Sequence, residues 1–374
     1  MKRLNTILVA ILFVLAGCGG EKYSAGDLIT VDVTASYPKK ELILQNFMDV
    51  EYIPLETTDE FITMAHIEAI GKEYLIVRNR HRSTDGKIFI YDRNGKALRM
   101  INRLGESAEE YLFLLGVTLD EDKEEMFVND HFSRKIYVFD LYGKFKRSLE
   151  FKEETSYNNN IYNFDQDHLI CCDGSMNFDG EMKNKFLVLS KQDGTVVEEI
   201  KIPYKENITS TILNTSGNIV LPIRNEELVP YSDGWLVMEP SSDTIYNYSP
   251  DHQMIPFIAR TPSIGSMETK VFLYPNVSTD RYCFMQTVEK EYNFGTREGH
   301  KRTNLMYDKQ AGNIYEYTVY NGDFSTKRTV DLAHETTVLN NDEIAFMRKY
   351  EAHDLVEAYE KGELKGQLKE NPIR

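Results

Sequence analysis

Short apolar segments with the alternation of a β-strand recur along the chain, separated by polar turns. Five copies of one strand follow each other at steps of 48, 50, 59 and 59 residues: KIFIYD (87–92), KIYVFD (135–140), KFLVLS (185–190), TIYNYS (244–249) and TNLMYD (303–308). In the first copy, Ile88 and Ile90 lie on one side of the strand and Phe89 and Tyr91 on the other. A strand that is apolar on both sides belongs between two packed sheets, so the copies are predicted to be interior strands.

Each copy is flanked by further strands, which makes the repeat a small sheet. A strand such as ALRMIN (97–102) returns after each copy, and a strand such as YLIVRN (74–79) precedes it. The turns fall on glycine in four copies and on PDHQ (250–253) in the fourth of the five: Gly95, Gly143, Gly194 and Gly312. Glycine suits a tight hairpin because its backbone adopts positive φ without strain. The repeat therefore predicts three or four antiparallel strands in about 50 residues.

Sheets that pack face to face in a ring form a β-propeller. Five repeats lie inside the chain, and its two ends supply strands for one more: 28–34 and 50–56 from the N-terminal side and 327–333 from the C-terminal side. Joining both ends in one blade would close the ring and hide exposed sheet edges. We predict an all-β, six-bladed β-propeller over residues 28–374 that is closed by N- and C-terminal strands.

The C-terminal region departs from the repeat. A polar stretch at 340–343 resembles a helix N-cap, and apolar residues then follow helical spacing: Ile344, Met347, Tyr350, Leu355, Val356 and Tyr359. The pattern predicts a helical segment at about 342–368, with its apolar stripe packed on the propeller.

The N-terminus has the features of a lipoprotein signal peptide. A basic start at Lys2 and Arg3 precedes an apolar run at 7–14, too short to span a bilayer, and then Ala16, Gly17 and Cys18. This order predicts cleavage of residues 1–17, lipid on Cys18 and a tether at 18–27; the alternative is an ordinary secretory signal with a chance cysteine. Gly19 stands where aspartate would retain the protein in the inner membrane, which favours the outer membrane, on either its periplasmic or its surface face.

Charge and cysteine content restrict the partners. The formal net charge is −16, and an acidic chain repels phosphate backbones, so we expect no nucleic-acid partner. We expect a monomer.

After Cys18 only three cysteines follow, and the neighbours Cys171 and Cys172 would point to opposite sides of a strand. We expect buried thiols, with a single bridge to Cys283 as the alternative.

Several segments together resemble a known family. VEYIPLETTDEFI (50–62), KIFIYDRNGKALRMINRLGESAEEY (87–111) and EMFVNDHFSRKIYVFDLYGKFKRSLEF (125–151) are similar to the uncharacterised six-bladed β-propeller lipoproteins of Bacteroides-type bacteria. Relatives carry a glycine-rich loop after the first blade, of which this chain keeps Gly105 and the pair Glu110 and Tyr111. The resemblance implies the fold and an envelope location; it supplies no catalytic residues.

Two groups of polar residues are candidates for ligand binding. Equivalent positions after the second strand of a repeat hold two sets: Arg78, Arg80 and His81, and Asn129, Asp130 and His131. If these strand ends face the mouth of the channel, they would contact a ligand; the alternative is turn capping by Asn and Asp. Tyr157 and Tyr162 flank three asparagines in what we predict is an exposed loop, and their rings would stack on a glycan; core packing is the alternative.

Cofactor and catalytic motifs are sparse. Asp173, Ser175, Asn177 and Asp179 place oxygen atoms at alternate positions, a spacing that could wrap Ca²⁺, although Phe178 stands where an EF-hand loop needs glycine. A polar hairpin loop is the alternative, and no cofactor is predicted. The sequence contains no GxSxG, HExxH, P-loop or GxGxxG motif.

These observations favour a binding or scaffold module on the outer membrane for a small ligand, glycan or protein partner. The alternative is a propeller-type lyase or hydrolase acting on glycans or lactones, with a site in the central channel. Fold alone does not decide between them, because propellers host many activities.

The lipid anchor can be tested by removing its thiol. We expect a Cys18→Ala chain to leave the membrane fraction when cells are fractionated, because no acyl chain can then be attached. A Ser24→Ala chain, changed in the tether but keeping the thiol, should stay with the membrane. Unchanged membrane association of the Cys18→Ala chain would contradict the lipoprotein prediction.

Overall fold

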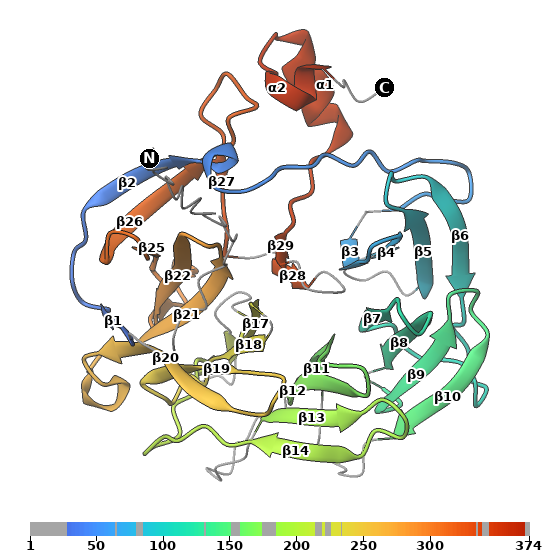
Figure 1. Cartoon of the computed structure of the whole chain (residues 1–374), viewed down its shortest axis with the longest axis horizontal. Coiled ribbons are helices and arrows are strands. Elements are labelled where there is room, and N and C mark those ends of the chain that lie inside the picture. The colour runs from blue at the N-terminus through green and yellow to red at the C-terminus, as the bar shows by residue number, and fades with distance from the viewer. Residues whose placement is uncertain are drawn as a thin grey trace, which may run out of the picture.

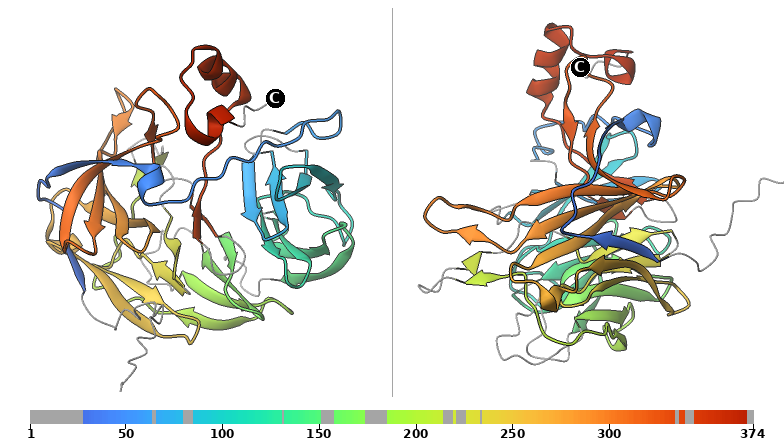
Figure 2. Two further views of the ribbon diagram at one scale, coloured as in Figure 1. Left: turned by 45° about the horizontal axis from the view of Figure 1, so that its top comes forward. Right: turned by 90° about the vertical axis from the view of Figure 1, so that its left-hand side faces the viewer.

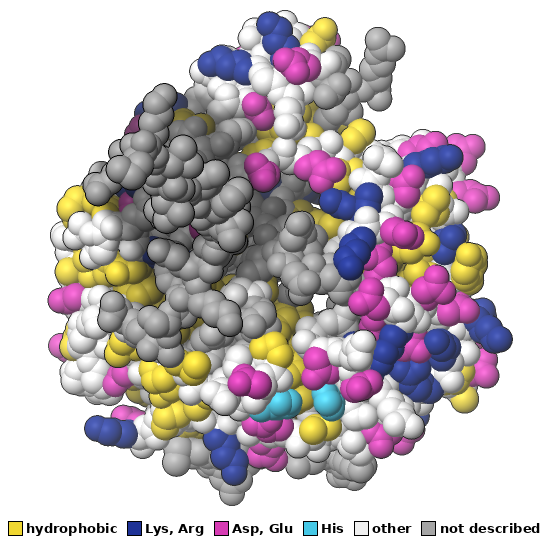
Figure 3. Space-filling view, in the orientation of Figure 1, with side chains coloured by type: hydrophobic (Ala, Val, Ile, Leu, Met, Phe, Trp, Pro, Cys, Tyr) yellow, Lys and Arg dark blue, Asp and Glu magenta, His cyan; other side chains and the backbone are white. Residues whose placement is uncertain are grey.

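The sheets stand side by side around a common centre in the computed structural model (Figure 1). The structure describes residues 28–63, 66–79, 85–130, 132–150, 158–173, 185–213, 219–220, 226–232, 234–333, 336–338 and 344–370. Five blades of four antiparallel strands follow one another around the ring. Figure 3 shows that the middle of the ring is hollowed on the face drawn, with acidic and basic side chains interspersed around it.

The five blades follow the predicted repeat. The first is β3 (His66–Ile70), β4 (Tyr74–Arg78), β5 (Lys87–Asp92) and β6 (Ala97–Asn102). The second is β7 (Gly116–Asp120), β8 (Glu125–Asp130), β9 (Lys135–Asp140) and β10 (Phe145–Glu150). The third is β11 (Asn158–Asn163), β12 (His168–Asp173), β13 (Phe186–Ser190) and β14 (Val196–Ile200). The fourth is β17 (Leu228–Tyr231), β18 (Gly234–Val237), β19 (Thr244–Tyr248) and β20 (Met254–Thr261). The fifth is β21 (Val271–Ser278), β22 (Tyr282–Glu289), β25 (Arg302–Asp308) and β26 (Asn313–Tyr320).

Smaller elements connect or decorate the blades. They are the hairpins of β15 (Ile212–Leu213) with β16 (Ile219–Val220) and of β23 (Tyr292–Asn293) with β24 (Glu298–Gly299), and the 3-10 turns η1 (Leu44–Asn46) and η2 (Ile264–Ser266). None of the helices in the described ranges has the length and apolar character that crossing a bilayer requires.

The interior strands are buried on both faces, as their sequence predicts. Ile88, Phe89, Ile90 and Tyr91 of β5 are all fully buried. The two isoleucines pack in a cluster shared with the second blade, whereas the two aromatic rings pack with Phe61 on the other side. The two faces of this sheet therefore pack on different neighbours, the second blade on one side and N-terminal residues on the other.

The hairpin turns confirm the role of glycine. Gly95, Gly143, Gly194 and Gly312 have φ values between 66° and 82°. In the fourth blade, where PDHQ replaces the glycine turn, His252 adopts the positive φ, at 61°. A Cβ at Gly95 would also lie 2.1 Å from the carbonyl oxygen of Pro54, so this position excludes a side chain for two separate reasons.

The prediction that both chain ends form one closing blade is wrong. The N-terminal strands instead lie parallel on existing blades, β1 (Ile29–Asp32) on β20 and β2 (Lys39–Ile43) on β26. The C-terminal strand β27 (Thr329–Val330) also pairs with β26. β20 and β26 are eight residues long, and the added strands cover backbone groups that would otherwise be unpaired at a sheet edge. The segment at 50–56 forms no strand and lies along the first blade, where the Glu56 N–H donates to the Gly95 carbonyl at 2.8 Å.

A hairpin stands at the sixth position of the ring. It consists of β28 (Thr336–Val338) and β29 (Ile344–Phe346) and lies toward the centre, between the fifth and first blades (Figure 1). β28 lies against β3 and β17, and β29 lies against β21, so the hairpin contacts the innermost strands of three blades. In the described part of the chain, the sixth unit is thus this pair of strands.

The C-terminal helices begin later than predicted. The structure has α1 (Ala352–Glu360) and α2 (Gly366–Glu370), whereas residues 344–346 of the predicted helical segment form β29. Figure 2 shows both helices standing off the rim of the ring. Leu355, Ala358 and Leu368 pack with Phe324, and Tyr52 packs against the same cluster, which confirms contact with the propeller. Val356 and Tyr359 of the predicted stripe are exposed.

The cysteines after Cys18 are free and buried, which confirms the prediction of buried thiols: Cys171, Cys172 and Cys283.

The loop at 103–111, which resembles the family loop, is organised around the side chain of Tyr111. Tyr111 is fully buried, and its hydroxyl donates to the Gly86 carbonyl at 2.5 Å and accepts from the Arg103 N–H at 3.1 Å. Burial raises the pKa of Tyr111 to about 12.

The parallel N-terminal strand can be tested through Val31, which is fully buried in the cluster between the fourth and fifth blades. We expect Val31→Ala to lower the free energy of unfolding by about 2 kcal/mol, because two buried methyl groups are lost. Thr30→Ala, at the exposed neighbour on the same strand, should change it by less than about 0.5 kcal/mol. Urea unfolding followed by fluorescence of the single tryptophan, Trp235 in the same sheet, measures both. Equal effects would contradict the packing of β1.

Candidate functional site

The strand registers bring the predicted polar residues to one end of the ring. At this end of the ring, the first strand of each blade begins and the second strand ends. His66 pairs with Arg78 in the first blade, and Gly116 pairs with Asn129 in the second. Asn158 and Asp173 form the corresponding pair in the third blade. We call this the polar end. Arg78 ends β4, and Asn129 and Asp130 end β8, so these residues lie at the polar end.

Arg78 takes part in a charged cluster between the first and second blades. Its Nε donates to Glu68 Oε1 at 2.6 Å, its Nη2 donates to the Leu115 carbonyl at 2.7 Å, and His66 Nε2 lies 3.0 Å from the same Glu68 oxygen. The other Glu68 oxygen accepts the Val117 N–H at 2.9 Å. Because β3 and β4 place these side chains against the start of β7, the cluster joins two blades through one carboxylate.

Glu68 stays ionised despite its burial. Burial alone acts to raise the pKa of Glu68, but the His66 hydrogen bond and the Arg78 charge outweigh it, so the pKa lies below its ordinary value of 4.5. The carboxylate is then a fixed negative charge at neutral pH, held by donors from three directions.

The side chain of Asp130 caps a turn, which was the predicted alternative to ligand contact. It is fully buried, and its carboxylate accepts the backbone N–H groups of Leu112 at 2.6 Å, Phe132 at 2.9 Å and Ser133 at 3.2 Å. Asn129 is buried, and its carbonyl accepts the Leu115 N–H at 2.9 Å. Arg80, His81 and His131 lie outside the described residues.

The prediction that Tyr162 lies in an exposed loop is wrong. Tyr162 belongs to β11, and its ring packs on Trp235 of the fourth blade at 4.9 Å between centroids. Its hydroxyl donates to Glu226 at 3.2 Å, and Asn160 donates to the same oxygen at 2.9 Å. The polar sequence is a strand because its backbone pairs with the apolar strand β12, which supplies the burial that β11 lacks. Tyr157 lies outside the described residues.

A second charged cluster, which the sequence did not predict, joins the third and fourth blades. Lys185 Nζ lies 3.1 Å from both Glu227 and Glu239, and Cys172 Sγ donates to Glu227 at 3.3 Å. Lys185 precedes β13, whereas Glu227 precedes β17 and Glu239 follows β18, so the cluster again lies at the polar end. Its sequence signal was Glu239 at the end of GWLVME (234–239), the strand before the fourth copy, whereas YLIVRN (74–79), the corresponding strand of the first repeat, ends in asparagine.

The charges of this cluster fix its protonation. Burial alone would lower the pKa of Lys185, but Glu227 and Glu239 raise it above its ordinary value, so the ammonium persists. Burial, reinforced by the Glu227 charge, raises the pKa of Cys172 well above its ordinary value of 9.0. Cys172 is thus a neutral thiol at physiological pH, and a neutral thiol is a poor nucleophile and metal ligand.

The candidate calcium loop lies almost wholly outside the described residues. Asp173 is the last residue of β12, and Ser175, Asn177 and Asp179 fall beyond the described range. Among the residues that the structure describes, no three His, Cys, Asp or Glu side chains are grouped so that they could hold a metal ion.

The radial sheets, the two-sided burial and the polar end define a β-propeller. The family model DUF5128, described as a 6-bladed beta-propeller, matches residues 21–345, so the chain belongs to this family. The resemblance to a six-bladed propeller family and the all-β fold class are confirmed. No curated protein matches the chain.

Two solved structures are similar to the chain at low sequence identity. A candidate exported protein of Bacteroides fragilis NCTC 9343 is 12% identical, with a TM-score of 0.55 over 92% of this chain and 94% of that chain. A member of the DUF4221 family from Bacteroides vulgatus ATCC 8482 is 10% identical, with a TM-score of 0.44 over 73% of this chain and 88% of that chain.

The ionised state of Glu68 can be tested by the pH dependence of stability. Because its folded pKa lies below the unfolded value, its contribution is present at neutral pH and is lost as the pH falls below about 4.5 through the folded pKa. We expect Glu68→Gln to lower the free energy of unfolding by about 2 kcal/mol at pH 7 and by much less at about pH 3. Urea titrations at both pH values measure this. Glu73→Gln, at an exposed position in the following turn, should show no such dependence; a deficit for Glu68→Gln that is equal at both pH values would contradict the assignment.

Proposed function

We propose that the chain is a non-enzymatic binding module that holds a polar ligand, such as a glycan, at the polar end of its propeller. The observation that carries this proposal is the pair of charged clusters built across blade boundaries at this end. Glu68 with Arg78 lies between the first two blades, and Lys185 with Glu227 lies between the third and fourth. Groups fixed by such contacts are oriented before a ligand arrives, which lowers the entropy lost on binding.

Asn160 and Glu226 are the groups best placed to contact the ligand. Asn160 is exposed on the innermost strand of the third blade, and its amide already donates to Glu226. An exposed amide beside a carboxylate offers both donors and acceptors, as the hydroxyl groups of a sugar require. The ring of Tyr162 is occupied by Trp235, so we expect recognition by hydrogen bonds rather than by stacking on Tyr162.

Two observations favour binding over the alternative of a lyase or hydrolase. The carboxylates of the charged clusters are paired with cations or with backbone donors, and Cys172 is a neutral thiol, so the described part of the polar end offers no evident nucleophile. The β28–β29 hairpin lies toward the centre of the ring against β3, β17 and β21, where a channel site would need space.

The proposal includes an envelope location, with the chain anchored by lipid on Cys18 as a monomer. It is supported by the sequence order of Lys2, Arg3, the apolar run and Cys18, and by the description of the Bacteroides fragilis protein of the same fold as a candidate exported protein. The membrane face is left open by the sequence after Cys18.

Screening the chain from residue 19 onward against glycans and metabolites tests the function. We expect a ligand whose affinity falls about tenfold in Asn160→Ala, because one hydrogen bond beside a charged group is lost. Lys123→Ala, in the turn between β7 and β8 at the opposite end, should bind normally. Mass spectrometry of the recovered ligand reports on catalysis. Conversion of the ligand, or equal affinity of both variants, would contradict a binding function at this end.

A further inference from the structure

Two histidines meet at the end of the ring opposite the polar end, where the third and fourth blades pack together. His168 begins β12, and His252 lies in the turn that follows β19. Their ring centroids are 6.4 Å apart, and the rings are nearly perpendicular, at 82°. Figure 3 shows histidine side chains gathered at this boundary on the face drawn. The two side chains are 26% and 35% exposed, so an ion from solvent can reach both rings.

Each imidazole is oriented through its Nδ1 by a carboxylate. His168 Nδ1 lies 2.9 and 2.8 Å from the two oxygens of Asp165, and His252 Nδ1 lies 2.5 Å from Glu198 Oε2. The Tyr248 hydroxyl donates to the same Glu198 oxygen at 2.9 Å. Because a carboxylate only accepts hydrogen bonds, each Nδ1 carries the proton, and in a neutral ring Nε2 then has the lone pair.

The two Nε2 atoms remain open to a ligand. In the described part of the chain, the hydrogen bonds of both rings go through Nδ1. A histidine whose Nδ1–H is held by a carboxylate is the usual form of a metal-bound imidazole. Metal–nitrogen bonds of about 2.0 to 2.1 Å place the centres of two imidazoles that share one ion roughly 5 to 6.5 Å apart. The separation of His168 and His252 lies within that range.

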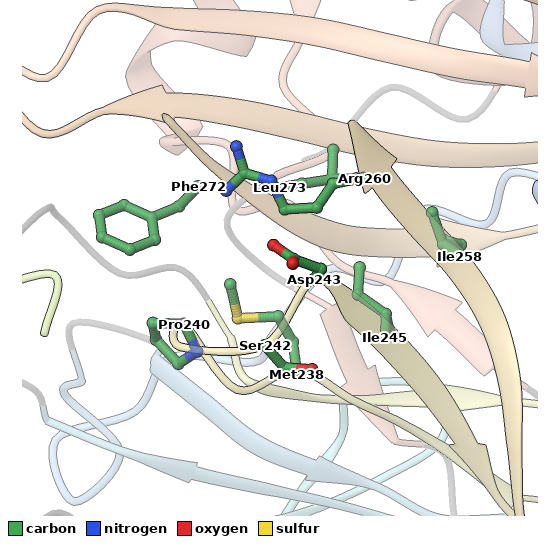
Figure 4. Close-up of a pocket in the computed structure, with 9 residues that line it drawn as sticks. All are labelled: Met238, Pro240, Ser242, Asp243, Ile245, Ile258, Arg260, Phe272 and Leu273. Carbon is green, nitrogen blue, oxygen red and sulfur yellow. The ribbon is translucent and has the colours of Figure 1, made fainter. Parts of the chain in front are cut away.

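The bases at the neighbouring boundaries cannot bind a metal in this way. Lys191 pairs with Asp120 between the second and third blades, and Arg260 faces Asp243 between the fourth and fifth (Figure 4). Ammonium and guanidinium groups only donate hydrogen bonds and have no lone pair to offer at neutral pH. Lys191 also donates to the Asp165 carbonyl at 2.7 Å, but its charge is paired with Asp120. The boundary between the third and fourth blades thus offers ligand atoms beside two carboxylates, which favour a cation.

We propose that Nε2 of His168 and Nε2 of His252 bind one divalent transition-metal ion, with water completing its coordination. Imidazole nitrogen suits Zn²⁺ and Cu²⁺, whereas Ca²⁺ and Mg²⁺ prefer oxygen ligands, and Cu²⁺ should bind more tightly than Zn²⁺. A site with two protein ligands keeps open positions, unlike the closed four-ligand sites that hold a structural zinc. It lies away from the polar end, and the proposal does not depend on the function proposed there.

Isothermal titration with Zn²⁺ of the chain from residue 19 onward, without a histidine tag, tests the proposal. We expect one Zn²⁺ per chain, displaced by Cu²⁺ but not by Ca²⁺ or Mg²⁺. His168→Ala and His252→Ala should each weaken Zn²⁺ binding at least about tenfold, because one of two ligands is lost. His353→Ala, an exposed histidine on α1, should bind normally. Equal affinity of all three variants, or displacement of Zn²⁺ by Ca²⁺, would overturn the proposal.

A second pair of variants tests the carboxylate that orients His252. Glu198→Ala should weaken Zn²⁺ binding about 10- to 100-fold, because the ring loses the group that fixes its Nε2. Asp251→Ala, which removes an equal charge from the exposed position beside His252, should have little effect. Electron paramagnetic resonance of Cu²⁺ on the unchanged chain should show coupling to the nitrogens of two imidazoles, a signature that does not require any variant to fold. Absence of imidazole coupling, or equal effects of the two acidic variants, would overturn the proposal.

Discussion

The whole structure depends on sheets that bury both faces. The interior strand of the first blade, with Phe89 and Ile90 on opposite sides, has no exposed face, so a single blade would present a large apolar surface to water. Neighbouring blades cover most of these faces, and hydrophobic clusters lie between consecutive blades. The remaining faces of the first and fifth blades pack against N-terminal residues such as Phe61 and Leu44.

Charged side chains that are buried at those same boundaries are mostly paired. Between the second and third blades, Lys191 Nζ lies 2.6 Å from Asp120, and both residues are at most 5% exposed. Such a pair adds little net stability, but it disfavours any other arrangement of the two sheets, because each charge would then be buried without its partner. The clusters of Glu68 and Lys185 follow the same rule at the polar end. Among the described charged groups Arg260 differs, since its Nη2 donates to the sulfur of Met267 and its buried Nε has no hydrogen-bond partner.

The sequence was informative where a feature is local and less so where partners come from distant segments. The apolar copies and their glycine turns identify the five blades, because two-sided burial requires consecutive apolar residues and positive φ favours glycine. The pairing of β1 with β20 leaves no such mark, since a strand that adds to an existing edge looks like any other strand. Asn160 and Tyr162 seemed typical of a loop because the burial of β11 comes from β12. Lys185 was missed because its two carboxylates belong to the next blade.

The parallel pairing of the first strand has a consequence for the order of events during synthesis. Ile29 aligns with Ile258, so the first described strand leaves the ribosome some 230 residues before its partner exists. At about 5 to 20 residues per second, that segment waits for roughly 10 to 50 seconds. Blades one to three can assemble from neighbouring hairpins in that interval, whereas β1 and β2 must join late. The N-terminal strands are thus added to sheets that are synthesised long after them.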